Sequence, residues 1–127
     1  MSKKILIIDD DKTFQKVMSD KLKSLNYEIT SAMDGEEGLK MALEGKPDLV
    51  LLDIKMPKLD GIDFLKALKA KKDVDPISVL ITSNLGTVEQ ISEGIALGVK
   101  GYIIKSNESL DTIVKEVEDV FKPTDNK

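Results

Sequence analysis

Four short apolar runs in this chain each end at a polar residue that can handle phosphate or a metal ion. The runs are residues 5–8 before Asp9 and Asp10, 49–52 before Asp53, 79–81 before Thr82, and 102–104 before Lys105. Such runs, separated by segments with helical periodicity, are typical of strands in a parallel sheet that is covered on both faces. In these sheets ligands bind outside the carboxyl ends of the strands. The pattern therefore predicts one shared site at which the four endings meet.

Predicted strands and helices alternate five times along the chain. The apolar pattern predicts strands over residues 5–8, 27–30, 48–53, 77–81 and 101–104, and helices over residues 14–25, 35–43, 62–68, 88–95 and 110–121. Short loops in such an alternation require right-handed crossovers. We predict an α/β fold, a flavodoxin-like (βα)5 doubly wound sandwich with a parallel five-stranded sheet in the strand order 2-1-3-4-5. Strand 48–53, the most apolar, is expected at the centre, and strand 27–30 at an edge.

Length and composition indicate a single domain. Of the 127 residues, 41% are hydrophobic and 33% are charged, and we expect residues 1–122 to form the domain and 123–127 a short flexible tail. No apolar run approaches the roughly 20 residues of a membrane helix. The first strand begins near Met1 without the pattern of a secretory signal. We therefore expect a cytoplasmic protein without membrane contact. The absence of cysteine excludes disulfides and thiolate metal sites.

The charged residues argue against nucleic-acid binding and against histidine chemistry. All 19 basic residues are lysines and the formal net charge is -4, whereas nucleic-acid recognition usually relies on arginine and a basic patch. The lysine cluster at residues 66, 69, 71 and 72 is expected to complement a helix carboxyl terminus. Because the chain has no histidine, it has no internal phosphohistidine, no Ser-His-Asp triad and no imidazole metal ligand.

Asp9, Asp10 and Asp53 are expected to lie close together, because the first and third strands are neighbours in the predicted order. At a separation of about 4 Å and an effective dielectric constant of about 20, each pair of carboxylates repels by roughly 4 kcal/mol. A hard dication would relieve this repulsion. Oxygen ligands without histidine or cysteine favour Mg²⁺ or Mn²⁺ over Zn²⁺, and Mg²⁺ is the expected cofactor. The alternative is a set of solvated acids at strand ends.

Thr82 and Lys105 add a hydroxyl donor and a positive charge at the same end of the sheet. Both groups suit a tetrahedral oxyanion. A carboxylate nucleophile flanked by a dication, a hydroxyl and an ammonium group favours in-line phosphoryl transfer to an aspartate, because that reaction depends on positioning and charge neutralisation. Taken alone, Lys105 would be interpreted as a surface lysine.

This combination of motifs resembles the receiver domain of two-component response regulators, of the single-domain type, over nearly the whole chain. The matching motifs are the acidic pair at residues 9–10, Asp53 followed by IKMPKLDG, ITS at residues 81–83, and GYIIK at residues 101–105. The resemblance implies that Asp53 accepts a phosphoryl group. The implied metal ligands are Asp9, Asp10, Asp53 and the backbone carbonyl of Lys55. Thr82 would then move toward the phosphoryl group, and Tyr102 would turn inward into the space that it leaves.

These roles imply a phosphorylation-dependent signalling switch and not an enzyme with an external substrate. The expected partners are a histidine kinase or histidine phosphotransfer protein and a downstream protein target, with the chain as a monomer or a phosphorylation-dependent dimer. Phosphorylation adds a charge of about -1.5 to -2 and three acceptors at Asp53. Thr82 and Lys105 can satisfy them only by drawing their strand ends inward. The change is expected to reach the surface of the fourth helix, fifth strand and fifth helix.

Three positions near the site either differ from the family pattern or are variable within the family. Ser106 follows Lys105, where the family usually has proline, so the loop before the last helix is expected to have a different shape. Lys55 and Asn84 occupy variable positions two residues after the acceptor and two after the threonine. Our hypothesis is that Lys55 reaches over the site and, by altering water access, influences the lifetime of the phosphoryl group. An unchanged dephosphorylation rate in Lys55→Ala would refute it.

Three other interpretations remain at this point. A haloacid-dehalogenase-type phosphatase would use Asp9 as nucleophile and Asp11 as general acid and base, since residues 9–13 satisfy a DxDxT motif. That family's later acidic pair is missing here, and Asp53 would have no role. A pseudo-receiver would act only as a protein interaction module. A nucleotide-binding flavodoxin-like domain is disfavoured, because no glycine-rich phosphate loop follows the first strand.

Overall fold

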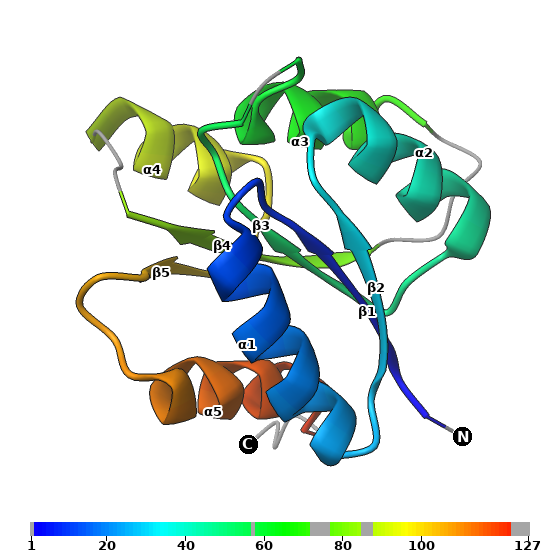
Figure 1. The fold of residues 1–127 in the computed structure, drawn as a ribbon. Coiled ribbons are helices and arrows are strands. Elements are labelled where there is room, and N and C mark those ends of the chain that lie inside the picture. The colour runs from blue at the N-terminus through cyan, green and yellow to red at the C-terminus, as the bar shows by residue number, and fades with distance from the viewer. Residues whose placement is uncertain (1, 57, 72–76, 85–87, 123–127) are drawn as a thin grey trace, which may run out of the picture.

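The computed structural model describes residues 2–56, 58–71, 77–84 and 88–122. Within these residues five strands alternate with five helices (Figure 1). The strands are β1 (Lys4–Ile8), β2 (Glu28–Ala32), β3 (Leu49–Leu52), β4 (Ser78–Ser83) and β5 (Gly101–Ile104). The helices are α1 (Lys12–Ser24), α2 (Gly35–Gly45), α3 (Gly61–Lys69), α4 (Val88–Ala96) and α5 (Leu110–Phe121). The predicted alternation is therefore confirmed.

The five strands form one parallel sheet in the order β2-β1-β3-β4-β5. This order confirms the predicted flavodoxin-like topology, with β3 at the centre and β2 at an edge as expected. Across the sheet, Ile8 pairs with Leu52, Leu52 with Ile81, and Ile81 with Tyr102. Because these residues are in register, the residues that follow β1 and β3 lie beside the last residues of β4.

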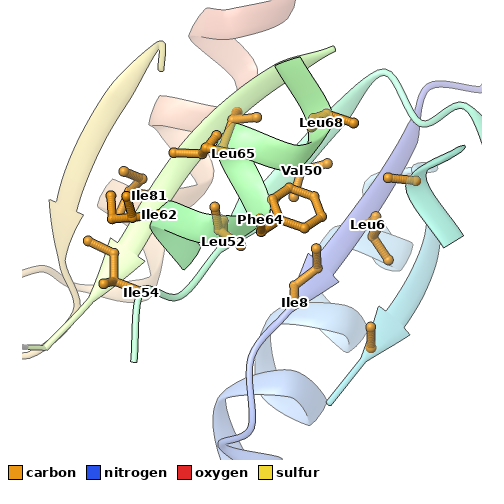
Figure 2. Packing of buried hydrophobic residues seen from close by; sticks show 13 residues of the cluster. Leu6, Ile8, Val50, Leu52, Ile54, Ile62, Phe64, Leu65, Leu68 and Ile81 are labelled. Carbon is orange, nitrogen blue, oxygen red and sulfur yellow. The ribbon is translucent and has the colours of Figure 1, made fainter. Parts of the chain in front are cut away.

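Helices cover both faces of the sheet: α1 and α5 lie on one face, and α2, α3 and α4 on the other (Figure 1). Each face has its own hydrophobic core. The α2–α3 cluster contains Phe64 and is shown in Figure 2; its members are Leu6, Ile8, Ala32, Ala42, Val50, Leu52, Ile54, Ile62, Phe64, Leu65, Leu68, Val79 and Ile81. The α1–α5 cluster consists of Ile5, Ile7, Met18, Leu22, Leu49, Leu51, Leu80, Ile103, Ile113, Val114 and Val117. The alternating residues of each strand divide between the two clusters, as a sheet covered on both faces requires.

Polar side chains at the amino ends fix where four of the helices begin. Asp11, Asp34, Asp60 and Ser109 each accept a hydrogen bond from the backbone N–H three residues ahead. Such a cap contributes about 1 kcal/mol to stability. Because Asp11 caps α1, this helix begins at Lys12, two residues before the start predicted from the apolar pattern. β2 and β4 each extend two residues beyond their predicted ends at 30 and 81.

The predicted tail, residues 123–127, lies outside the described residues, and the domain boundary at residue 122 stays a prediction. No helix in the described part of the chain combines the length and the apolar character that crossing a membrane requires.

Candidate functional site

Three carboxylates meet at the carboxyl edge of the sheet. Asp9 and Asp10 follow β1 and Asp53 follows β3, and one carboxylate oxygen from each of the three lies within 4.8 Å of the others. Asp9 is 0% exposed and Asp53 is 6% exposed, whereas Asp10 is exposed. The acidic cluster predicted from the strand endings is therefore present in the structure. Its two inner acids are buried, and Asp10 faces solvent.

Backbone hydrogen bonds extend the sheet by one residue into this site. The N–H of Asp9 donates to the carbonyl of Ala32 at 3.0 Å, and the N–H of Asp53 donates to the carbonyl of Ile8 at 2.9 Å. The N–H of Asp11 donates to Oδ1 of Asp9 at 2.9 Å. Because the first two bonds continue the ladders of the sheet, Asp9 and Asp53 are held on its hydrogen-bonded part.

Burial raises the pKa of both inner carboxyl groups. The pKa of Asp9 rises from 3.8 to about 6; burial is the largest cause and the charge of Asp53 adds to it, while hydrogen bonds from Lys105 and Asp11 oppose it. Burial likewise raises the pKa of Asp53, against the opposing effects of Lys105, Ser83 and a backbone hydrogen bond from Lys55. Both acids are thus poorly compensated as anions, and an added cation would stabilise them.

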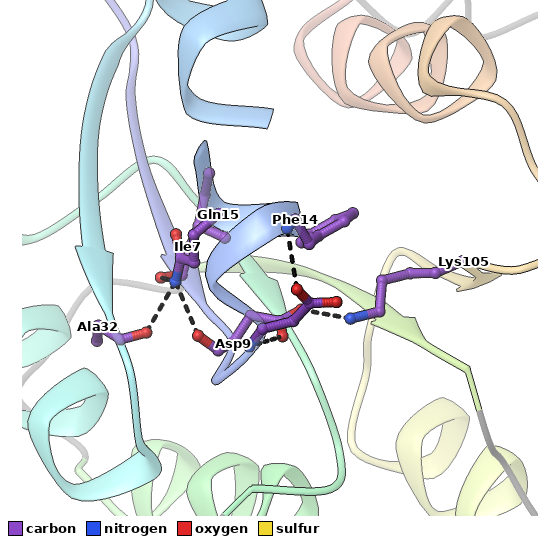
Figure 3. A network of polar contacts seen from close by, with 7 residues as sticks. Ile7, Asp9, Phe14, Gln15, Ala32 and Lys105 are labelled. Carbon is purple, nitrogen blue, oxygen red and sulfur yellow. Dashed lines mark hydrogen bonds and ion pairs between the residues drawn. The ribbon is translucent and has the colours of Figure 1, made fainter. Parts of the chain in front are cut away.

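Lys105 follows β5 and is fixed between an acid and an aromatic ring. Its Nζ lies 2.7 Å from Oδ2 of Asp9 and 4.4 Å from the centroid of the Phe14 ring, and its side chain is only 8% exposed (Figure 3). Its backbone N–H donates to the carbonyl of Ser83 at 3.0 Å. The predicted ammonium group is therefore present in the site, held by Asp9.

Thr82 and Tyr102 bring their hydroxyl groups toward the interior from β4 and β5. Thr82 is fully buried, and its Oγ1 has no hydrogen-bond partner among the described residues. Tyr102 packs against the α2–α3 cluster, and its hydroxyl oxygen is buried. Burial, with the negative charge of Asp53, raises the pKa of Tyr102. Tyr102 thus faces inward in this structure, the position that we expected it to take with the phosphoryl group present.

The loop that follows Asp53 folds back closely on it. The N–H of Gly61 donates to the carbonyl of Ile54 at 2.8 Å. A Cβ atom at Gly61 would lie 2.5 Å from the backbone oxygen of Asp53, which explains why glycine stands here. Lys55 in this loop is exposed, and its effect on water access stays a prediction.

The structure also shows the positions of the other residues singled out in the sequence. Asp11, the acid and base of the phosphatase interpretation, accepts the N–H of Phe14 at 3.1 Å and caps α1. Ser106 lies in a turn closed by a hydrogen bond from the N–H of Asn107 to the carbonyl of Ile104 at 3.0 Å. Two residues in contact with the site had no role in the predicted receiver site: Ser83, which hydrogen-bonds Asp53, and Gln15, which binds the carbonyl of Asp9. The position of Ser83, next to Thr82 at a strand end, could have indicated its role.

The family model described as "Response regulator receiver domain" matches residues 5–118. The chain belongs to this family. It is therefore a receiver domain of a two-component response regulator, a class of signalling switch that interacts with histidine kinases. A role for Asp9 and Asp11 in a haloacid-dehalogenase-type phosphatase has no support in this family.

Known proteins similar to this receiver domain include transcriptional regulators. The alkaline phosphatase synthesis transcriptional regulatory protein PhoP of Bacillus subtilis is 38% identical over 105 residues, which are 83% of this chain and 43% of PhoP. The DNA-binding dual master transcriptional regulator RpaA of Synechocystis is 30% identical over 122 residues, which are 96% of this chain and 50% of RpaA. The chain thus spans half or less of the length of these relatives. The expectation that it binds no nucleic acid stays a prediction.

The solved structure of a chemotaxis protein matches nearly the whole chain. The chemotaxis protein CheY4 of Vibrio cholerae aligns with a TM-score of 0.85 and 27% identity, over 95% of this chain and 100% of CheY4. The flavodoxin-like architecture of this receiver domain is therefore the one found in CheY4.

Proposed function

We propose that this receiver domain takes a phosphoryl group onto Asp53 from a histidine kinase or a histidine phosphotransfer protein. The meeting of three carboxylates within 4.8 Å, beside the Lys105 ammonium, supports this function most directly. No other described group of acidic side chains comes together in this way. Asp53 is the candidate acceptor because, unlike Asp9, it is not hydrogen-bonded by Lys105.

The chemistry of the donor set fits Mg²⁺ or Mn²⁺. All three side-chain donors are carboxylate oxygens, two of them are buried, and burial raises their pKa values. Asp9, Asp10 and Asp53 would hold the ion, with the backbone carbonyl of Lys55 as the further proposed ligand. Exposed Asp10 leaves one side of the cluster open, where water and phosphate oxygens could complete the coordination. When bound, the ion would neutralise charge on the transferring phosphoryl oxygens.

The side chains around Asp53 would then bind and orient the phosphoryl group. A carboxylate oxygen of Asp53 forms the new bond to phosphorus while the phosphorus–nitrogen bond of a phosphohistidine breaks, and the imidazole nitrogen keeps the electron pair. Lys105 would leave Asp9 to contact the new phosphoryl oxygens. The hydroxyl of Thr82, which has no partner among the described residues, would donate to another. Both movements pull the ends of β4 and β5 toward Asp53.

A protein target is proposed for the surface formed by α4, β5 and α5. Val88 and Ile95 on α4 are 75% and 65% exposed, so this helix presents apolar side chains to solvent. Exposed apolar side chains of this size suit a protein partner or a second copy of the chain.

Light scattering before and after phosphorylation would measure whether a dimer forms. A mobility-shift assay with duplex DNA would test the predicted lack of nucleic-acid binding.

Intact-protein mass spectrometry tests the acceptor. Wild type, Asp53→Asn and the control Asp63→Asn, which changes an exposed acid of α3, are incubated with acetyl phosphate with and without Mg²⁺. We expect a gain of about 80 Da, one phosphoryl group, in wild type and Asp63→Asn with Mg²⁺ only. No gain in folded wild type would favour the interaction-module function or strict dependence on a kinase. A gain in Asp53→Asn would show that another residue is the acceptor.

A further inference from the structure

Gln15 is a buried amide in the second turn of α1, and its Nε2 lies among three backbone carbonyls (Figure 3). The distances are 2.9 Å to the oxygen of Ile7, 3.1 Å to that of Asp9 and 2.9 Å to that of Ala32. Gln15 is 6% exposed. A buried side chain that binds three main-chain oxygens at once is a fixed connection between helix and sheet.

The surroundings of the amide fix its orientation. Three carbonyl oxygens around one terminal atom require a donor there, because an amide oxygen in that place would be repelled by all three. The NH₂ group has two hydrogen atoms for three acceptors, so at least one hydrogen is shared. Oε1 points away and has no partner among the described residues. The side chain is thus used for its donor end alone.

The three carbonyls surround the acidic residue on which the site depends. One belongs to Asp9 itself, one to Ile7 two residues before it, and one to Ala32, which also accepts the N–H of Asp9. On the side-chain end, Oδ1 of Asp9 accepts the N–H of Asp11. Gln15 therefore holds the backbone from which the carboxylates of Asp9 and Asp10 project.

We propose that Gln15 is a positioning residue for Mg²⁺, which fixes the backbone of Asp9 and Asp10 so that their carboxylates meet Asp53. This inference rests on the proposed metal site. Groups that hold metal ligands in place change metal affinity by about 10- to 100-fold when they are removed. A hydrocarbon side chain would leave the carbonyls of Ile7 and Asp9 without this donor.

Isothermal titration of the folded protein with MgCl₂ tests this role. Gln15→Met keeps the length and approximate volume of the side chain but removes its donors. Met18→Ala is the control, since it opens a cavity in the same helix without touching the carbonyls around Asp9. We expect Mg²⁺ binding at least about tenfold weaker in Gln15→Met, and unchanged in Met18→Ala although that variant unfolds more easily. Circular dichroism would confirm that both variants are folded.

The outcomes separate this inference from the proposed function. If wild type binds Mg²⁺ and folded Gln15→Met binds it equally well, the inference is wrong and the metal site stands. If wild type does not bind Mg²⁺, the metal site itself is wrong and the inference falls with it. If Gln15→Met does not fold, NMR spectroscopy of the wild type provides a second test. The side-chain NH₂ resonances of Gln15 should shift during the Mg²⁺ titration together with the backbone amide resonance of Asp10. Resonances that stay fixed while Asp10 shifts would overturn the proposal.

Discussion

The ammonium of Lys105 lies 2.7 Å from Oδ2 of Asp9, and both side chains are buried. The same carboxylate belongs to the cluster proposed to bind Mg²⁺. Before any metal or phosphate arrives, Lys105 supplies the positive charge that the three acids require. A metal ion that binds Asp9 would therefore compete with an internal cation, and an ammonium released from Asp9 would become available to a phosphoryl group on Asp53.

Replacing Lys105 should strengthen Mg²⁺ binding. In Lys105→Met the competing ammonium is lost, so the three carboxylates attract the dication more strongly. We expect an increase in affinity of roughly tenfold, since a single charge at this range in a partly buried site contributes more than about 1 kcal/mol. Isothermal titration would measure it, with Lys100→Met, a change at an exposed lysine just before β5, as the control. Weaker binding in Lys105→Met would show that Lys105 supports the metal site instead of competing for it.

The free energy of unfolding of the metal-free protein should depend on pH because of Asp9. Its folded pKa of about 6 lies above its ordinary value of 3.8, so between these values the folded state holds a proton that the unfolded state has lost. Stability from this residue is therefore present at low pH and is lost as the pH rises through about 6. The loss amounts to roughly 3 kcal/mol for a shift of this size. Asp9→Asn removes the titration.

Urea unfolding without metal, at several pH values from about 4 to 7.5, would measure this effect as the difference between wild type and Asp9→Asn. As the pH rises, wild type should become less stable relative to Asp9→Asn. Addition of Mg²⁺ at the upper end should stabilise wild type more than the variant. A difference that does not vary with pH would mean that Asp9 keeps its ordinary pKa.

Glycine at position 61 should be required by the close return of the loop to Asp53. In Gly61→Ala the new Cβ would lie 2.5 Å from the backbone oxygen of Asp53 and 2.7 Å from Cα of Ile54. Both contacts are with backbone, so the loop itself must shift, and we expect a loss of about 1–3 kcal/mol in the free energy of unfolding. Gly45→Ala is the matched control, because nothing lies within 4 Å of a Cβ there. Denaturant unfolding that ranks the two variants equally would contradict this account.

The hydroxyl of Thr82 should lower the stability of the unphosphorylated protein. Thr82→Val keeps the shape of the side chain and removes a buried oxygen that has no partner among the described residues. We expect the unmodified protein to gain about 1 kcal/mol in stability, and phosphorylation to stabilise the variant less than wild type. Ser83→Ala is the opposite case, since its hydroxyl hydrogen-bonds Asp53, and it should destabilise. Thermal unfolding in the presence of Mg²⁺, with and without acetyl phosphate, would compare all three proteins.

The sequence predicted the sheet order and the meeting of the acids for the same physical reason. Apolar runs of strand length have few ways to be buried, and once β1 and β3 are neighbours in register, Asp9 and Asp53 must lie side by side. The meeting of these acids can be predicted from the sequence because it depends only on which residue types follow neighbouring strands. The prediction does not require the positions of the side chains within the site.

Gln15 and the partner of Lys105 could not be predicted in this way. The partners of Gln15 are main-chain carbonyls, which every residue has, so no residue pattern marks them. Lys105 could reach either Asp9 or Asp53 from the end of β5, and the choice depends on the position of its side chain over Phe14. The start of α1 was missed because its cap, Asp11, lies outside the apolar repeat.

The two hydrophobic clusters share no member among the described residues, because the sheet lies between them. Tyr102 packs only against the α2–α3 cluster, so a change in its position alters packing on that side of the sheet. The layer of α1 and α5 can then keep its own core intact while the opposite layer rearranges. Amide hydrogen exchange should therefore find α1, which lies on the face away from Tyr102, equally protected in both states of Asp53, whereas the protection of α4 and β5, which belong to the proposed target surface, should depend on that state.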